Sequence, residues 1–322
     1  MARKKVLLTQ AIHESGVEVL AEDFDVKLAD DFSVEGLKKE VGDVHGILAR
    51  TALLPREVLE AAPHLEVVAR HGVGVDNIDV AYLTEKGIPL CFTPTANALS
   101  VAEWTLTAIS ALAKGLLIYD RAVREGNWER RNEYKIIDID GKKLGLVGLG
   151  RIGTLVAAKA KAAYNMEVLV FDPYVDEAKG SELGVTIVKS LEELLPQVDF
   201  LSLHLPLTEE SRDLIGAEEL AQMKETAFLI NAARGGIVNE EALVKALREN
   251  QIAGAALDVF EAEPPAKDSP LWELDNLIVA PHLAALTQEC VIRMATIAAQ
   301  GIKDVLQGRK PEFVYNREIF DK

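Results

Sequence analysis

The sequence has little cysteine, a deficit of positive charge and no long hydrophobic run. Only Cys91 and Cys290 are cysteines among 322 residues, which argues against a disulfide framework and against a thiolate metal cluster. We therefore expect no bound metal and a reducing, cytoplasmic location. The formal net charge of −16 repels nucleic acid and anionic lipid surfaces, so we expect no nucleic-acid partner.

The longest stretch without Asp, Glu, Lys or Arg covers residues 87–102 and contains two prolines. A helix that crosses a bilayer needs about 20 apolar residues, so we expect no membrane segment. The N-terminus shows no signal-peptide core, and its first apolar run, residues 6–8, indicates a β-strand.

What is present is typical of a globular protein, with 49% hydrophobic and 27% charged residues. The length predicts two domains. In the first part of the chain, apolar runs alternate with amphipathic segments, which indicates β-α units and a parallel sheet. The apolar runs are residues 6–8, 46–49, 66–69 and 88–91, and the amphipathic segments include 14–21 and 55–61.

The rest of the chain predicts a second, doubly wound sheet. Residues 98–125 form one long helical pattern, which we expect to be buried at a domain or subunit boundary. Further strands are expected at residues 143–147, 167–171, 185–188, 199–203, 227–230, 254–259 and 277–280, and a last helix at 288–306. Ser190 with Glu193 predicts a capping box, and Asn239 predicts a helix start.

A glycine-rich loop, Gly-Leu-Gly-Arg-Ile-Gly at residues 148–153, follows the strand 143–147. The motif alone could be an ordinary turn. Its strand–turn–helix context and Asp172, which closes the next strand and stands 22 residues beyond Gly150, together indicate a dinucleotide site. Because no Arg or Lys lies between Asp172 and Lys179, a 2′-phosphate would lack a cationic partner. The pattern favours NAD over NADP.

Three later segments carry residue types that hydride transfer to or from an alcohol requires, a base and a cation for an anionic substrate. Arg234 follows a strand end, where α/β sheets bind ligands. Glu263 precedes Pro264, and His282 follows Pro281. Taken singly, these could be a solvated loop arginine, a turn carboxylate and a structural histidine.

Together the motifs resemble the NAD-dependent D-2-hydroxyacid dehydrogenases, in the branch of phosphoglycerate dehydrogenase and hydroxypyruvate/glyoxylate reductase. The resemblance covers nearly the whole chain, through residues 71–79, 100–103, 148–153, 204–208, 231–236, 258–264 and 280–285. It implies an α/β protein with two Rossmann-like parallel-sheet domains. A flavodoxin-like substrate domain would comprise residues 1–98 and 288–322, and a doubly wound NAD-binding domain residues 99–287. Because the sequence stops at Lys322, we expect the short form without a serine-sensing regulatory domain.

The resemblance implies that Arg234, Glu263 and His282 form a catalytic triad. Neutral His282 would accept the hydroxyl proton during oxidation, and protonated His282 would donate it during reduction. Glu263 would orient the imidazole and stabilise its protonated form. Arg234 would bind the substrate carboxylate, with the backbone at Val73 and Gly74 completing a carboxylate nest from the other domain.

The resemblance also implies a set of ligand contacts. The cofactor contacts would be Val73, Gly148, Gly150, Arg151, Ile152, Gly153, Asp172, His204, Pro206, Thr208, Ala232, Ala233, Asp258 and His282. We expect Asp258 near the nicotinamide amide and His204 near the adenine pocket. The substrate contacts would be Arg50, Val73, Gly74 and Arg234. Arg50 would bind a second anionic group or, alternatively, lie in a surface ion pair.

The implied activity is the NAD-dependent interconversion of a small anionic D-2-hydroxyacid and its 2-keto acid, with 3-phosphoglycerate or hydroxypyruvate/glyoxylate as candidates. Residues 283–285 read Leu-Ala-Ala where phosphoglycerate dehydrogenases commonly carry Ile-Gly-Gly, which leaves the substrate open. The helix after Ser100 and an arm over residues 126–137, with Trp128 and Tyr134, would build a two-fold homodimer. The alternative function is an NAD-sensing binding protein of corepressor type, which could keep the triad. In formate dehydrogenase a glutamine partners the histidine, so Glu263 argues against that enzyme.

Overall fold

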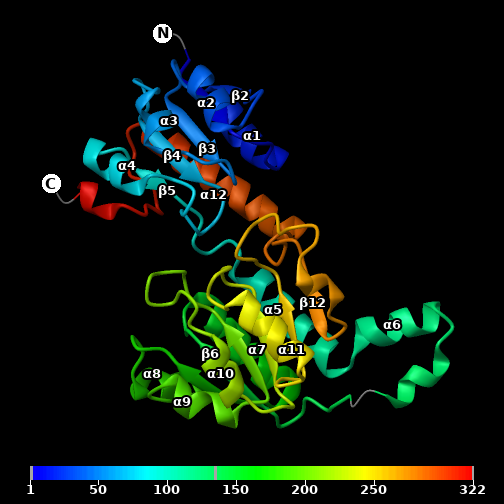
Figure 1. Ribbon diagram of the computed structural model, residues 1–322. Coiled ribbons are helices and arrows are strands. Elements are labelled where there is room, and N and C mark those ends of the chain that lie inside the picture. The colour runs from blue at the N-terminus through cyan, green and yellow to red at the C-terminus, as the bar shows by residue number, and fades with distance from the viewer. Residues whose placement is uncertain (1–2, 134–135, 321–322) are drawn as a thin grey trace. The chain divides into compact units, whose positions relative to one another are not determined.

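The computed structural model describes residues 3–133 and 136–320. The chain forms two compact units, one made of Met1–Asn97 with Ala285–Lys322 and the other of Ala98–Ala284 (Figure 1). We call them unit 1 and unit 2. Tyr134 of the predicted arm lies outside the described residues.

Unit 1 contains a five-stranded parallel sheet with the strand order β2-β1-β3-β4-β5. This order is flavodoxin-like, as predicted. The elements are β1 (Lys5–Leu8), α1 (Glu14–Ala21), β2 (Asp25–Leu28), α2 (Val34–Glu40), β3 (Gly46–Ala49), α3 (Arg56–Glu60), β4 (Val67–Arg70), α4 (Val80–Lys86), β5 (Leu90–Cys91), α12 (Gln288–Leu306) and η4 (Arg317–Phe320). The edge strand β2 was not predicted, because it is short and half polar, with Leu28 exposed.

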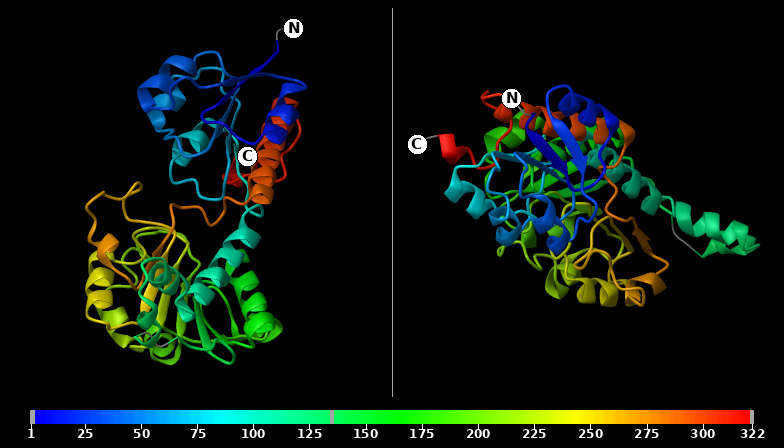
Figure 2. Two further views of the ribbon diagram at one scale, coloured as in Figure 1. Left: turned by 90° about the vertical axis from the view of Figure 1, so that its right-hand side faces the viewer. Right: turned by 90° about the horizontal axis from the view of Figure 1, so that it is seen from above.

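Helices cover both faces of this sheet. On one face Leu37, Leu59 and Leu83, from α2, α3 and α4, enter the same hydrophobic cluster. On the other face α1 and α12 pack side by side, with Leu20 and Ala298 in one cluster (Figure 2). Unit 1 is therefore a three-layer α/β/α structure in which a helix from the C-terminal part of the chain completes one layer.

Unit 2 contains a seven-stranded parallel sheet with the order β12-β11-β10-β9-β6-β7-β8, a doubly wound arrangement as predicted. Its strands are β6 (Lys143–Val147), β7 (Glu167–Phe171), β8 (Thr186–Ile187), β9 (Phe200–Leu203), β10 (Phe228–Asn231), β11 (Gly254–Leu257) and β12 (Leu277–Val279). Its helices are α5 (Ala98–Ala113), α6 (Leu116–Arg124), η1 (Trp128–Asn132), α7 (Arg151–Tyr164), α8 (Glu177–Leu183), α9 (Leu191–Leu194), η2 (Leu195–Gln197), α10 (Ala217–Gln222), α11 (Glu240–Arg248) and η3 (Pro270–Glu273).

The register of this sheet determines where the functional candidates lie. Asn231 at the end of β10 is opposite Leu203 of β9 and Leu257 of β11, and Leu257 is opposite Val279 of β12. The carboxyl ends of these parallel strands therefore reach the same edge of the sheet, and the loops that follow them share that edge. The two predicted helix starts are also confirmed, since Ser190 caps α9 and Asn239 caps α11.

The single helix predicted over residues 98–125 is wrong in its second half. The chain forms α5 and α6, bent by 57° relative to each other. Gly115, between them, has a left-handed backbone with φ of 56°, which ends the first helix. The apolar residues of α5 are largely buried, whereas Leu116, Leu117 and Val123 of α6 are more than half exposed. The helix α6 and the following η1 project from the rest of unit 2 (Figures 1 and 2).

Among the described residues, a single helix never reaches the length and apolar character needed to cross a membrane, and only the bent pair α5 and α6 meets that test, by length and composition.

Candidate active site

The glycine loop after β6 is shaped by three glycines with different requirements. Gly148 has a φ of 94°, and a Cβ there would lie 2.4 Å from the His204 carbonyl oxygen. A Cβ at Gly153 would lie 2.3 Å from the Gly148 carbonyl oxygen. A Cβ at Gly150, in contrast, would have no described atom within 4 Å. The first and third glycines are thus required by the fold, and the second leaves backbone open to a ligand.

Asp172 holds this loop in place. One of its carboxylate oxygens accepts a hydrogen bond of 2.8 Å from the Leu149 N–H, and the other accepts one of 2.9 Å from the Tyr174 N–H. Each oxygen retains a lone pair for a hydroxyl donor. The helix α7 begins directly after Gly150, so its first N–H groups point towards the space beside the glycine loop and Asp172. The loop, the helix start and Asp172 fit the pyrophosphate and ribose of a dinucleotide.

Alanine at Gly148 and at Gly150 is expected to have opposite effects. Gly148→Ala should lower the free energy of unfolding by about 1–3 kcal/mol, because it strains a left-handed residue and overlaps a carbonyl oxygen. Gly150→Ala should change stability by less than about 0.5 kcal/mol and weaken NADH binding by about tenfold or more, because only the ligand meets the new methyl group. Urea unfolding and NADH fluorescence titration measure the two quantities. Unchanged NADH affinity in Gly150→Ala would contradict the site.

The candidate acid–base pair is His282 and Glu263. The imidazole Nδ1 lies 2.7 Å from one oxygen of the Glu263 carboxylate. The other oxygen accepts a hydrogen bond from the Phe260 N–H at 3.1 Å, which ties the carboxylate to its own loop. Because Nδ1 faces the carboxylate, Nε2 is the ring nitrogen that is available for proton exchange with a ligand. The His282 side chain is half exposed and can be reached by one.

Asp258 holds the turn that carries His282. His282 has a φ of 50°, a left-handed backbone that non-glycine residues rarely adopt. Its N–H donates to the Asp258 carbonyl oxygen, and the next two N–H groups, of Leu283 and Ala284, donate to the two Asp258 carboxylate oxygens at 2.7 and 2.9 Å. Burial raises the pKa of the Asp258 carboxyl above its ordinary value. This role was missed from the sequence, where Asp258 was expected only near nicotinamide.

The Arg234 loop and the Glu263 loop touch each other. A Cβ at Gly235 would lie 1.7 Å from the Phe260 carbonyl oxygen, so no larger residue fits between the two loops without moving one of them. The Glu263 loop is anchored in turn to α11, because Glu240 and Glu261 each accept a hydrogen bond from the other's N–H, at 2.6 and 2.9 Å. The contacts bring Arg234, Glu263 and His282 onto one edge of unit 2.

The remaining predicted cofactor residues of unit 2 lie on that edge as well. Arg151 and Ile152 open α7, and Ala232 and Ala233 follow β10. Pro206 and Thr208 follow β9, where the Ser211 hydroxyl bonds both the Pro206 carbonyl oxygen and the Thr208 N–H. Ser211 was not predicted, because a loop serine carries no sequence signal for such a contact.

The substrate residues predicted in unit 1 lie at the carboxyl ends of β3 and β4. Arg50 donates to the Ala11 carbonyl oxygen at 2.8 Å, so its contact is a carbonyl rather than the surface ion pair that was the alternative. Arg70, which was not predicted, donates to the His71 carbonyl oxygen. Burial, followed by the charges of Arg50 and Arg70, lowers the pKa of His71 to about 4. Val73 and Gly74 follow and are half-buried.

His204 is a second neutral histidine, and its side chain is half-buried. Its Nε2 lies 3.0 Å from the Ser202 hydroxyl, and its Nδ1 is buried without a hydrogen-bond partner among the described residues. Burial lowers its pKa to about 4. The side chain therefore carries no charge near neutral pH, and its place near adenine stays a prediction.

We expect His71 and His204 to make the stability of the fold sensitive to acid. Each has a folded pKa of about 4 against an ordinary value of 6.5, so the unfolded chain binds the proton first. Their stabilisation is complete above pH 6.5 and is lost as the pH falls towards 4. For each histidine, protonation of the unfolded chain should lower the free energy of unfolding by about 2 kcal/mol as the pH falls from 7.5 to 5.0, and urea denaturation measures this loss. His204→Gln should lose less over this interval than the native chain, and an unchanged loss would contradict the assignment. His64→Gln, at an exposed position, is the control.

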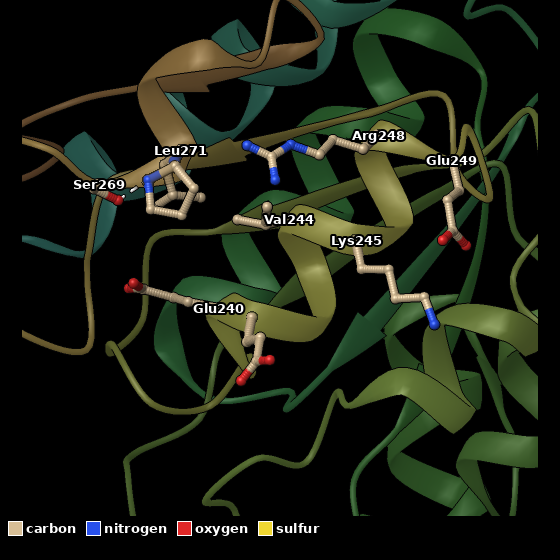
Figure 3. A pocket seen from close by; sticks show the side chains of 9 residues that line it. Glu240, Val244, Lys245, Arg248, Glu249, Ser269 and Leu271 are labelled. Carbon is tan, nitrogen blue, oxygen red and sulfur yellow. Dashed lines mark hydrogen bonds between the residues drawn. The ribbon is translucent and has the colours of Figure 1, made fainter.

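A surface depression of unit 2 is lined by α11 and η3 (Figure 3). Arg248 extends over Val244 towards Leu271 in this view and pairs with Glu273 at 2.6 Å. The described residues that line it include none of the predicted site residues. In the described part of the chain, no three His, Cys, Asp or Glu side chains are grouped so as to hold a metal ion.

Comparison with known proteins decides the family. Residues 106–284, more than half of the chain, match the sequence profile described as "D-isomer specific 2-hydroxyacid dehydrogenase, NAD binding domain". The chain belongs to this family. The match covers the glycine loop, Asp172 and all three triad candidates.

Individual members of the family show similarity over nearly the whole chain. The D-3-phosphoglycerate dehydrogenase of Methanocaldococcus jannaschii is 42% identical over 97% of this chain, which spans 59% of that protein's length. The glyoxylate reductase of Korarchaeum cryptofilum is 40% identical, over 98% of this chain and 97% of its own. The NADPH-dependent glyoxylate/hydroxypyruvate reductase of Sinorhizobium meliloti, solved with NADP and malonate, superposes with a TM-score of 0.87 at 28% identity, over 98% and 97% of the two chains.

Proposed function

We propose that the protein is an NAD-dependent D-2-hydroxyacid dehydrogenase. The observation that carries this proposal is the hydrogen-bonded pair of His282 and Glu263, on the sheet edge that also presents Arg234 and the glycine loop. A histidine held by a carboxylate, beside an arginine and a dinucleotide loop, has the parts that transfer of a proton and a hydride requires.

The residues divide the chemistry among them. The guanidinium of Arg234 binds the substrate carboxylate through its fork of donors and polarises the neighbouring oxygen. In reduction His282 donates its Nε2 proton to the carbonyl oxygen, and in oxidation it removes the hydroxyl proton. Glu263 holds the ring and stabilises the imidazolium. The bound nicotinamide cofactor supplies or accepts the hydride.

NAD is the proposed cofactor. The Asp172 carboxylate accepts bonds from the glycine loop and can accept ribose hydroxyls. The same charge repels a 2′-phosphate, and the sequence up to Lys179 provides no cation to balance it. The remaining cofactor contacts are proposed as in the sequence analysis.

The proposed substrate is a small 2-keto or 2-hydroxy acid with an anionic or polar tail. Arg234 would bind its carboxylate, and Val73 and Gly74 stay predicted substrate contacts. The relatives include phosphoglycerate dehydrogenases and glyoxylate reductases, whose named substrates differ in the tail. Arg50 favours an anionic tail. The guanidinium of Arg70 lies close enough to His71 for its charge, like that of Arg50, to lower the pKa of His71.

A homodimer in the cytoplasm is part of the proposal. The α6–η1 arm carries apolar side chains that are more than half exposed, namely Leu116, Leu117, Val123 and Trp128. Such a surface is typical of a protein interface, and a second copy of the arm is the partner we propose. Both cysteines are free and buried, which supports a reducing compartment. Sedimentation velocity of the purified protein should show a dimer.

Turnover of 2-keto acids tests the function. Purified protein is mixed with NADH or NADPH and with glyoxylate, hydroxypyruvate or phosphohydroxypyruvate, and loss of absorbance at the nicotinamide band is followed. We expect turnover of at least one acid, faster with NADH. Tight NADH binding without turnover of these or larger 2-keto acids would favour an NAD-sensing binding protein instead.

A further inference from the structure

The loop that carries Arg234 begins at a buried amide side chain. Asn231 is the last residue of β10, is only 1% exposed, and is in register with two buried leucines, Leu203 and Leu257. A polar side chain buried at such a position costs free energy unless its groups are hydrogen-bonded. The bonds that it makes therefore show what it is for.

Both ends of the Asn231 amide bind the loop that follows. The Oδ1 atom accepts a hydrogen bond of 3.0 Å from the Ala233 N–H, and Nδ2 donates one of 2.9 Å to the Arg234 carbonyl oxygen. The backbone carbonyl oxygen of Asn231 also accepts the Asp258 N–H at 2.9 Å. The side chain thus closes a short ring over residues 231–234, and the backbone of the same residue joins this ring to Asp258, which holds the His282 turn.

Ala233 links this ring to the guanidinium. Its N–H is held by Asn231, and its carbonyl oxygen accepts a 2.7 Å hydrogen bond from Arg234 Nη1. A shift of the Ala233 peptide would therefore move the Arg234 head group as well as its backbone. An arginine side chain has much rotamer freedom, and restraint at both places limits it before a ligand binds.

We propose that Asn231 is the positioning residue of Arg234. It touches neither substrate nor the reacting atoms and acts by fixing the loop from which the guanidinium reaches the substrate carboxylate. Because Arg234 matters for turnover only if the proposed dehydrogenase function is right, the role of Asn231 rests on that function.

A double-mutant cycle tests the role, with kcat and KM measured for the best 2-keto acid. Asn231→Ala should lower kcat/KM by about 50-fold, with a raised KM for the acid, because a misplaced binding group costs about that much. In an Arg234→Ala background the same substitution should change kcat/KM by less than about threefold, since residues that act through one another are not additive. Equal effects in both backgrounds would overturn the proposal.

Asn316→Ala is the matched control. Asn316 is equally buried, and its amide likewise accepts a backbone N–H, that of Leu90 at 2.8 Å, and donates to a backbone carbonyl oxygen, that of Ile88 at 2.9 Å, but it lies in unit 1. We expect its removal to lower stability and to show no coupling with Arg234→Ala. Coupling as large as that of Asn231 would mean that general loss of stability explains the result, and would overturn the proposal.

Hydrogen exchange provides a measurement that does not need turnover. In Asn231→Ala, amides of the 232–236 loop should exchange at least about tenfold faster than in the native chain, while β9 amides remain protected. Unchanged exchange in the loop would overturn the ordering role. If the native chain turns over no 2-keto acid, the proposed function is wrong, and exchange alone then decides whether Asn231 orders the loop.

Discussion

His282→Ala is expected to reduce kcat by about 10³-fold or more while leaving the dissociation constant of NADH within about threefold. The imidazole is the candidate proton donor and acceptor, and its Nδ1 is already committed to Glu263 at 2.7 Å. Removing the ring deletes the proton transfer and leaves the glycine loop and Asp172 unchanged. Steady-state kinetics with NADH and the best 2-keto acid, beside NADH titration, measures both effects.

Two further variants make this result specific. Glu263→Gln should give an intermediate loss of kcat, because the amide oxygen can still accept from the ring but no longer balances the imidazolium charge. His64→Ala, at an exposed position in unit 1, should leave kcat unchanged. If His282→Ala retained more than about a tenth of the native kcat, another group would have to be the acid–base catalyst.

Asp258→Asn carries the second largest expected effect, a loss of about 100-fold in kcat with little change in overall fold. Both Asp258 oxygens accept backbone N–H groups, those of Leu283 and Ala284. Asparagine offers one oxygen and one NH₂ group, so one of these N–H donors would face another donor. The left-handed turn at His282, with φ of 50°, would lose part of its support and the imidazole would shift.

The measurement pairs kinetics with stability. Asp79→Asn is the matched control, because Asp79 accepts the Tyr82 N–H as the N-cap of α4 and asparagine serves equally well there. The control should keep native kcat and native stability. Asp258→Asn should lose about 1–3 kcal/mol of unfolding free energy for the unpaired N–H, together with the fall in kcat. Native kcat in Asp258→Asn would show that the turn does not need the carboxylate.

The sequence predicted much of the fold because local patterns were enough. The strands 143–147 and 167–171 and the helices 14–21 and 288–306 match β6, β7, α1 and α12 at both ends. Apolar runs bounded by turn residues identified them. The need for glycine at positions 148 and 153 could also be predicted from the motif, since only glycine tolerates the close backbone contacts there.

What remained unpredicted depends on contacts between distant parts of the chain. The sequence does not predict the break between α5 and α6 at Gly115, because a glycine within a helical pattern can continue the helix or end it. The roles of Asn231 and Asp258 appear only when β10, β11 and β12 lie side by side and their end residues meet. The sequence by itself predicted which residues carry the proposed chemistry. Only the tertiary structure decided how they are held, because the groups that hold them are buried polar side chains whose partners are set by strand order.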